Sequence, residues 1–199
     1  MKGCLHKVGI KLKGPLYKIY TNRSFYIILF GMYNLKLYSI MKMEYFVWRI
    51  GDVMKVYKFY GNESKDVLPI DDKYKKIKNQ RHLYDILDNL WEKKTCAPRL
   101  QDGWSESNKT LGQCSITAFL VQDIFGGEVR GILRPAGNYH CYNVVGDSLF
   151  DLTSEQFGDE VLDYTDNPIQ TREEHFSKQE KYERYLYLKE KLDEVLKNM

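Results

Sequence analysis

The sequence predicts one domain of the α+β class behind an N-terminal extension. Two segments, 79–95 and 113–125, have apolar residues at helical spacing, and the chain ends in a third helical pattern. Short strand-like segments lie between them around a two-residue turn. Helices and hairpin strands in separate runs are typical of α+β domains. The chain has 199 residues, 43% of them hydrophobic and 29% charged, which is enough for one packed core.

The N-terminal extension differs in charge from the rest of the chain. Residues 1–43 contain eight Lys or Arg and no acidic residue, whereas the remaining 156 residues carry 22 basic and 27 acidic ones. Three interpretations stay open. The extension is a basic arm for an anionic surface, or additional β-structure in the Tyr- and Ile-rich segment 18–40, or an over-extended start. In the last case the later starts are Met41, Met43 and Met54.

A polar, turn-rich stretch separates the extension from the predicted domain. Residues 61–76, GNESKDVLPIDDKYKK, have the composition of a linker. We therefore expect residues 1–71 to be a poorly defined basic extension and linker, and residues 72–199 to form the domain.

The first predicted helix is followed by a long loop. The helix within 79–95 has Asn79 as its cap and a single apolar face formed by Leu83, Ile86, Leu87, Leu90 and Trp91. The loop runs from Thr95 to Leu111 and contains Trp104. Loops of this length in compact domains are often functional.

The second predicted helix leads into the predicted strands. It covers 113–125, with a core face formed by Ile116, Phe119, Leu120 and Ile124, and ends at two glycines. Strands are expected at 128–134, 139–145 and 148–153, the last two joined by a turn at Gly146 and Asp147. Capping-box spacing then predicts helix starts at Thr153, Thr171 and Ser177, with the C-terminal helix covering 177–197.

The chemistry-bearing candidates are a cysteine, a histidine and an aspartate on successive elements. Cys114 lies in the first turn of the second helix, where exposed N–H groups and the helix dipole favour a thiolate. His140 is the candidate base, and Asp151 lies on the next strand. A two-residue turn places Asp151 opposite Tyr142, diagonal to His140 on the same face and about 7–8 Å away at the backbone. A shift of one residue would move Asp151 to the other face.

Several motifs resemble the YunG family of uncharacterised bacterial proteins over about residues 80–195. The matching residues are Trp104, GQCSITAFLVQDIFGGE at 112–128, His140 with Asn143, and DLTSEQF at 151–157.

More distantly, the order of these residues resembles papain-like and transglutaminase-like cysteine enzymes. That resemblance implies a helix packed on a small antiparallel sheet. It also implies Cys114 as nucleophile, His140 as base and Asp151 as the orienting acid. Cys141 departs from the family pattern, because an aromatic residue is expected there.

Each further candidate has a structural alternative. Gln113 is either a helix cap or an oxyanion donor, and Trp104 is either a packing residue or a pocket wall. Asn143 belongs to the substrate-pocket candidates, but it alternates to the face opposite His140, which favours a structural hydrogen bond. Asp151 would equally cap the helix that starts near Thr153.

A metal site is a competing use of the same residues. Cys114, His140, Cys141 and Asp151 would supply four ligands, but His140 and Cys141 are adjacent on a strand and point to opposite faces. No CxxC spacing is present among Cys4, Cys96, Cys114 and Cys141. We expect no metal and no cofactor. Cys96, His82 and His175 are expected to be structural or exposed.

Together these patterns predict a cysteine-dependent hydrolase or acyltransferase acting on an amide or acyl substrate. The alternative is a non-catalytic interaction domain whose Tyr-rich C-terminal helix docks a partner. The mildly acidic body argues against nucleic-acid binding, and the apolar segment 25–35 is too short to span a membrane. No secretory signal pattern is present, so a cytoplasmic location is expected. The oligomeric state stays open.

Overall fold

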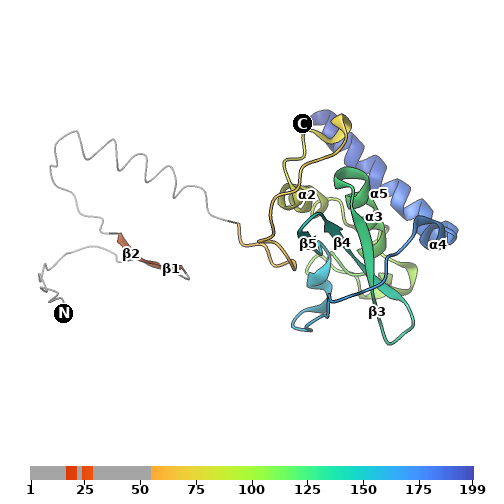
Figure 1. Cartoon of the computed structure of the whole chain (residues 1–199), viewed down its shortest axis with the longest axis horizontal. Helices are drawn as coiled ribbons and strands as arrows, with labels where there is room; N and C mark the ends of the chain where they lie inside the picture. Colours follow the sequence, from red (N-terminus) through yellow and green to blue (C-terminus); the bar gives the residue numbers. More distant parts are fainter. Residues whose placement is uncertain (1–16, 22–23, 29–54) are drawn as a thin grey trace, which may run out of the picture. The chain divides into compact units, whose positions relative to one another are not determined.

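A computed structural model describes residues 17–21, 24–28 and 55–199, and the chain divides into the units Met1–Lys55 and Val56–Met199. The described part of the first unit is an antiparallel pair of strands, β1 (Tyr17–Thr21) and β2 (Ser24–Ile28). This pair lies within the Tyr- and Ile-rich segment in which β-structure is one of the three interpretations (Figure 1). The possible later starts at Met41, Met43 and Met54 lie outside the described residues.

The second unit begins upstream of the predicted start at residue 72. Phe59 is fully buried and Val67 is buried in the same core. The backbone N–H of Asp151 donates to the carbonyl of Tyr60 at 2.9 Å. Residues 56–71 thus pack onto the unit rather than forming a linker, because two apolar side chains anchor an otherwise polar segment.

The sheet of this unit has three antiparallel strands in the order β3 (Glu128–Leu133), β4 (Tyr139–Val145) and β5 (Ser148–Phe150). Asn143 pairs with Phe150 and Val145 with Ser148. The β4–β5 connection is therefore the predicted two-residue turn, with Gly146 at a φ of 57°. This register places the end of β5 beside the start of β4.

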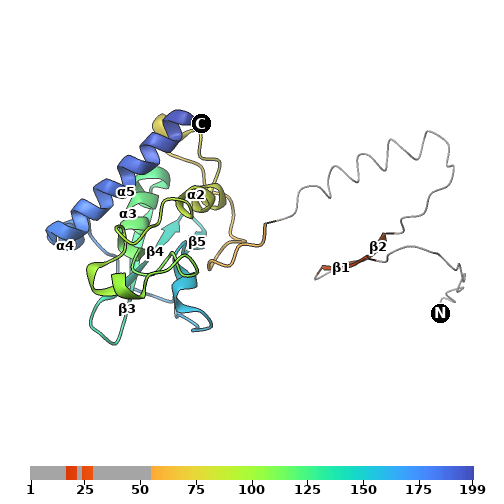
Figure 2. The ribbon, with the colours of Figure 1, turned by 180° about the vertical axis from the view of Figure 1, so that it is seen from behind.

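Helix α3 (Cys114–Phe125) forms the centre of the core. Its apolar residues Ile116, Phe119, Leu120 and Ile124 are all fully buried, as predicted. The helix contacts both β4 and the C-terminal helix α5 (Gln179–Asn198) and lies between them in the two opposite views (Figures 1 and 2). The unit is thus a mixed α+β structure.

Helix α2 (Gln80–Leu87) packs against the core beside α3. Asn79 caps it by accepting from the N–H of His82 at 2.9 Å, as predicted. Beyond its end, the indole N–H of Trp91 donates to the hydroxyl of Thr117 on α3 at 3.0 Å. A short 3₁₀ helix, η1 (Asp72–Tyr74), precedes α2, and another, η2 (Pro98–Gly103), lies in the long loop after it.

Two of the three predicted helix starts are confirmed. The hydroxyl of Thr171 accepts from the N–H of Glu174 and caps α4 (Arg172–Phe176). A short 3₁₀ helix, η3 (Ser154–Phe157), starts after Thr153, but the hydroxyl of Thr153 donates to Asp151 and does not cap it. The prediction is wrong at Ser177, because its hydroxyl donates to the carbonyl of Glu174 and α5 starts two residues later.

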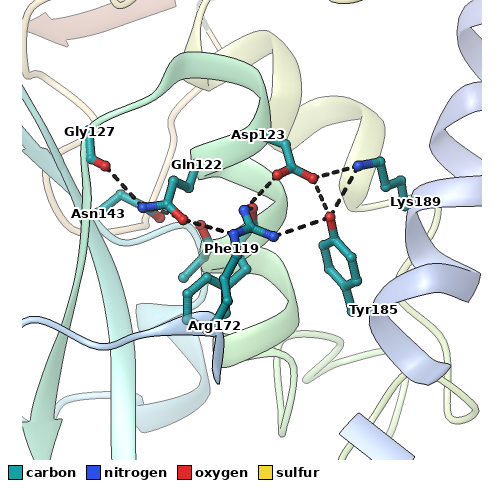
Figure 3. A network of polar contacts seen from close by, with 9 residues as sticks. Phe119, Gln122, Asp123, Gly127, Asn143, Arg172, Tyr185 and Lys189 are labelled. Carbon is teal, nitrogen blue, oxygen red and sulfur yellow. Dashed lines mark hydrogen bonds and ion pairs between the residues drawn. The ribbon is translucent and has the colours of Figure 1, made fainter. Parts of the chain in front are cut away.

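A polar network joins α3, α4 and α5 around one carboxylate (Figure 3). Asp123 on α3 accepts from Arg172 at 2.5 Å, from Lys189 at 2.7 Å and from the hydroxyl of Tyr185. Arg172 also donates to the carbonyl of Phe119 at 2.9 Å. These bonds fix the C-terminal helices against α3.

Among the helices of the described residues, none has both the length and the apolar character needed to cross a membrane.

Candidate active site

Cys114 is the first residue of α3, and its side chain is partly exposed. Gly112 precedes it with a φ of 70°, and a Cβ at this position would lie 2.7 Å from the Sγ of Cys96. A glycine is therefore needed here to bring the chain into the helix close to Cys96. The start of a helix presents unpaired N–H groups, which favour a negative charge on the thiol.

His140 lies on β4, and its side chain is buried. Its Nε2 lies 2.5 Å from the Oδ2 of Asp151. The ring of Phe157 meets the imidazole edge-on, with the ring centres 4.6 Å apart. Nδ1 is also buried and makes no hydrogen bond of ordinary geometry within the described residues. Nδ1 is therefore the ring nitrogen that Asp151 leaves without a partner.

Asp151 follows β5 directly and uses both carboxylate oxygens. Oδ2 accepts from His140 and from the hydroxyl of Tyr164, the latter at 3.0 Å. Oδ1 accepts from the N–H and the hydroxyl of Thr153, both at 3.0 Å. Asp151 thus makes the contacts expected both of a cap and of an acid that orients His140. Oδ1 binds Thr153 in the following turn, and Oδ2 holds His140.

Cys114 and His140 each influence the ionisation of the other. Burial raises the pKa of Cys114, but the neighbouring His140 acts against it, and the net effect lowers that pKa. Burial lowers the pKa of His140, but the charge and hydrogen bond of Asp151, together with Cys114, raise it to about 10. Both shifts favour a thiolate beside an imidazolium.

Cys114 and His140 both line a cavity of about 830 Å³. Its other walls come from residues 97–100, residues 134–139, the pair Gln156 and Phe157, and the α4–α5 segment. A cavity of this size can hold a substrate beside the thiol.

Three predicted pocket residues do not line this cavity. Gln113 is fully buried, and its amide donates to the carbonyl of Glu92 at 3.2 Å. Asn143 is buried on the opposite side of the strand and donates to the carbonyl of Ala118 at 2.9 Å. Trp104 donates to the carbonyl of Lys109 within its own loop at 3.1 Å. The N–H donors of all three side chains thus bind backbone carbonyls within the fold.

Other residues of the site carried little or no sequence signal. Phe157 lies within DLTSEQF, so its motif pointed to the region but not to the His140 contact. Tyr164 lies in an irregular segment and reaches Asp151 only through the tertiary structure. Lys181 and His175 enter the cavity wall from α5 and α4.

The remaining described thiols differ from Cys114. Cys96 and Cys141 are buried free cysteines. Burial raises the pKa of each of them. The Sγ of Cys141 lies 3.9 Å from the Nε2 of His175, so this position packs inside the core. Within the described residues, no three His, Cys, Asp or Glu side chains come together in a group that would hold a metal ion.

The fold and site define an α+β protein with a thiol at a helix start beside a buried His–Asp pair. Residues 79–197 match the family model described as YunG protein. A Bacillus subtilis (strain 168) protein described as "Uncharacterized protein YunG" is 33% identical over 109 residues, which cover 55% of this chain and 87% of that protein. The chain therefore belongs to the YunG family. No solved structure matches it significantly.

Proposed function

We propose that this chain is a cysteine-dependent hydrolase or acyltransferase that acts on an amide or acyl substrate. Cys114 is the nucleophile, His140 the general base and Asp151 the residue that orients His140. The observation that carries the proposal is the 2.5 Å contact between His140 and Asp151, since it leaves Nδ1 for Cys114 at the cavity wall. A nucleophile, a base and an orienting group in this order are the parts of thiol catalysis.

In the first half-reaction, the thiol proton of Cys114 passes to Nδ1 of His140. The thiolate attacks the substrate carbonyl carbon, forming an S–C bond and placing a negative charge on the carbonyl oxygen. As that intermediate collapses, the bond from carbon to the leaving group breaks. The leaving group takes the proton from His140, and a thioester on Cys114 remains.

The second half-reaction resolves the thioester. A water molecule or an amine gives a proton to His140 as it attacks the carbonyl. Collapse of the second intermediate breaks the S–C bond and returns the proton to the sulfur. Water gives hydrolysis, whereas an amine gives acyl transfer, so the same residues serve both outcomes.

The negative carbonyl oxygen needs hydrogen-bond donors in both halves. The proposal assigns this role to the backbone N–H groups of Cys114 and Ser115, which lie in the first helical turn and have no acceptor within the helix. The side-chain amide of Gln113 is not needed for this role, because it donates to Glu92.

A papain-like or transglutaminase-like relationship belongs to the same proposal. It is supported by the order of Cys114 on a helix, His140 on a strand and Asp151 after the next strand. A cytoplasmic setting also belongs to it, because the mechanism needs a reduced Cys114 and reducing compartments keep thiols free.

A docking role for the Tyr-rich helix α5 has less support. Tyr185 is buried, with its hydroxyl on Asp123, and the hydroxyl of Tyr187 donates to Glu92 at 2.7 Å. Both aromatic side chains thus hold the fold. Tyr182 and Leu186 are the exposed apolar residues of the helix, at 38% and 44%, and they offer only a small surface to a partner.

An activated ester tests the proposed function on the full chain. With p-nitrophenyl acetate, the account predicts a burst of about one equivalent of p-nitrophenolate and an acetyl group on Cys114 by peptide mass spectrometry. Cys114→Ala and His140→Ala should both abolish the burst. A burst of equal size in Cys114→Ala, or acetylation spread equally over Cys96 and Cys141, would contradict the proposal.

A further inference from the structure

The cavity beside Cys114 is lined by more cations than anions. The basic residues are Arg99, Arg134, Lys178, Lys181 and Arg184, and the acidic residues are Glu174 and Glu180. The body of the chain is mildly acidic, so this excess of positive charge is a property of the cavity rather than of the whole unit. Such a lining favours an anionic ligand.

Two of these cations already have anionic partners. Arg134 donates to both carboxylate oxygens of Glu160, at 2.7 and 2.9 Å. Arg184 donates to Glu180 at 3.0 Å and to the carbonyl of Thr95 at 3.0 Å. Their charges are largely compensated before any ligand binds.

Lys181 is held differently. It is partly buried, and its ammonium donates to the Nδ1 of His175 at 3.0 Å. The Nε2 of His175 in turn donates to the amide oxygen of Gln170 at 2.9 Å. Among the described residues, no carboxylate lies within ion-pair distance of the Lys181 ammonium. The position of the ammonium is thus fixed by His175, and the ammonium forms no direct ion pair with a carboxylate of the described residues.

His175 orients Lys181 without neutralising it. Burial, with the charges of Lys181 and Lys178, lowers the pKa of His175 to about 4. The ring is thus neutral at pH 7 and acts as a hydrogen-bond acceptor. Burial also lowers the pKa of Lys181, while the nearby thiols and the carboxylate of Glu180 act in the opposite direction. Lys181 and Cys114 line the same cavity.

We propose that the substrate carries an anionic group, a carboxylate or a phosphate, which binds the ammonium of Lys181 while its carbonyl lies at Cys114. This inference rests on the proposed function and narrows its substrate class. The fixed ammonium on the wall of the same cavity carries it. An uncompensated charge beside a partly enclosed space gains most from a ligand of opposite charge.

Two alkylating agents of similar size but different charge test this inference. The thiolate of Cys114 displaces iodide from both iodoacetate and iodoacetamide, forming an S–C bond as the C–I bond breaks. The ratio of the two rates, measured on Cys114 by peptide mass spectrometry, reports the field at the thiol. His140 contributes to this field in every variant, so the change on altering Lys181 is the informative quantity.

Lys181→Met should lower the ratio of the iodoacetate rate to the iodoacetamide rate by about fivefold, the effect expected when one unit charge no longer attracts the carboxylate of the reagent. Lys181→Arg should keep most of the preference. Lys197→Met is the matched control: Lys197 is on the same helix, about 24 Å further along its axis, and lines a different hollow. Lys197→Met should show the same ratio of the iodoacetate rate to the iodoacetamide rate as the wild type.

An unchanged ratio in Lys181→Met, or an equal loss in Lys197→Met, would overturn the inference. The iodoacetamide rate reports the proposed function through its dependence on His140, and the ratio of the two rates cancels any effect of Lys181 on the ionisation of Cys114, because both reagents react with the same thiolate. If the iodoacetamide rate did not depend on His140 while Lys181→Met still lowered the ratio, the result would contradict the proposed mechanism but not the anion site.

Competition separates the two anionic chemistries. Glutarate and inorganic phosphate are added in turn at constant ionic strength while Cys114 is alkylated with iodoacetamide. Protection by glutarate alone assigns a carboxylate, and protection by phosphate alone assigns a phosphate. Equal rates with and without both anions, in the wild type and in Lys181→Met, would contradict an anion site at Lys181.

Discussion

The Nε2 of His140 lies 2.5 Å from the Oδ2 of Asp151, and both side chains are buried. A buried imidazole with one nitrogen held by a carboxylate has a fixed ring orientation and a favoured positive charge. The second nitrogen then remains for Cys114.

The first prediction concerns pH and the His140–Asp151 pair. Asp151→Asn, made in a Cys114→Ser background so that no thiol titrates beside the ring, should lower the free energy of unfolding by about 1–3 kcal/mol at pH 6. The folded pKa of His140, about 10 in the native protein, lies above its usual 6.5. The interaction between Asp151 and protonated His140 therefore contributes fully to the free energy of unfolding below pH 6.5. This contribution is lost as the pH rises through the folded-state pKa of His140.

Urea unfolding at pH 6, 8 and 10 checks this. The difference between Cys114→Ser and the double variant should be largest at pH 6 and smaller at pH 10. A difference that stays constant over this range would show that Asp151 does not hold a proton on His140.

The second prediction makes Tyr164 a positioning residue. Tyr164→Phe removes the 3.0 Å hydrogen bond to Asp151 but keeps the ring that stacks on Tyr60. Stability should fall by about 1 kcal/mol. The pH profile of Cys114 alkylation should also shift, because Asp151 loses a donor on the oxygen that faces His140. An unchanged profile with the same loss of stability would leave Tyr164 a purely structural role.

The third prediction concerns the network around Asp123 (Figure 3). Asp123→Ala leaves Arg172, Lys189 and the hydroxyl of Tyr185 without their shared acceptor. We expect a loss of about 1–3 kcal/mol in the free energy of unfolding, as for other broken polar networks. The alkylation rate of Cys114 in the folded protein should remain close to wild type. A large fall in that rate would mean that the network also shapes the cavity.

The fourth prediction compares two glycines that both have positive φ. A Cβ at Gly127, with a φ of 75°, would lie 2.3 Å from the carbonyl oxygen of Val144, whereas a Cβ at Gly146 would meet nothing within 4 Å. Gly127→Ala should therefore cost about 3 kcal/mol or more, and Gly146→Ala about 1 kcal/mol, since only backbone strain remains there. Thermal unfolding of the two variants measures the difference, and equal costs would contradict the described packing of the α3–β3 connection.

The sequence predicted the elements whose signals are local. The two-residue turn at Gly146 and Asp147 determines how the residues on either side of it pair. The register of β4 and β5 therefore followed from a short motif. Helix α3 was also predictable, because four apolar residues define its buried face and Gly126 ends it. The turn brings His140 and Asp151 together, and the packing of α3 on β4 adds Cys114 to the same region.

The sequence could not predict contacts that depend on how distant segments dock. Gln113 looked available as an oxyanion donor, but the carbonyl of Glu92 takes up its amide. Lys181 carried no sequence signal, and it lines the cavity because of where α5 packs. Because residues 61–71 are mostly polar, their composition likewise did not indicate that Val67 is buried in the core.

The most direct test of the central claim is the pH dependence of Cys114 alkylation by iodoacetamide in the wild type and in His140→Ala. The wild type should show an inflection below the usual thiol pKa, since His140 lowers the pKa of Cys114. In His140→Ala the inflection should move to higher pH, because the main influence that opposes burial is lost, and the rate at pH 6.5 should fall about tenfold or more. An inflection at the same pH in both proteins would contradict the account.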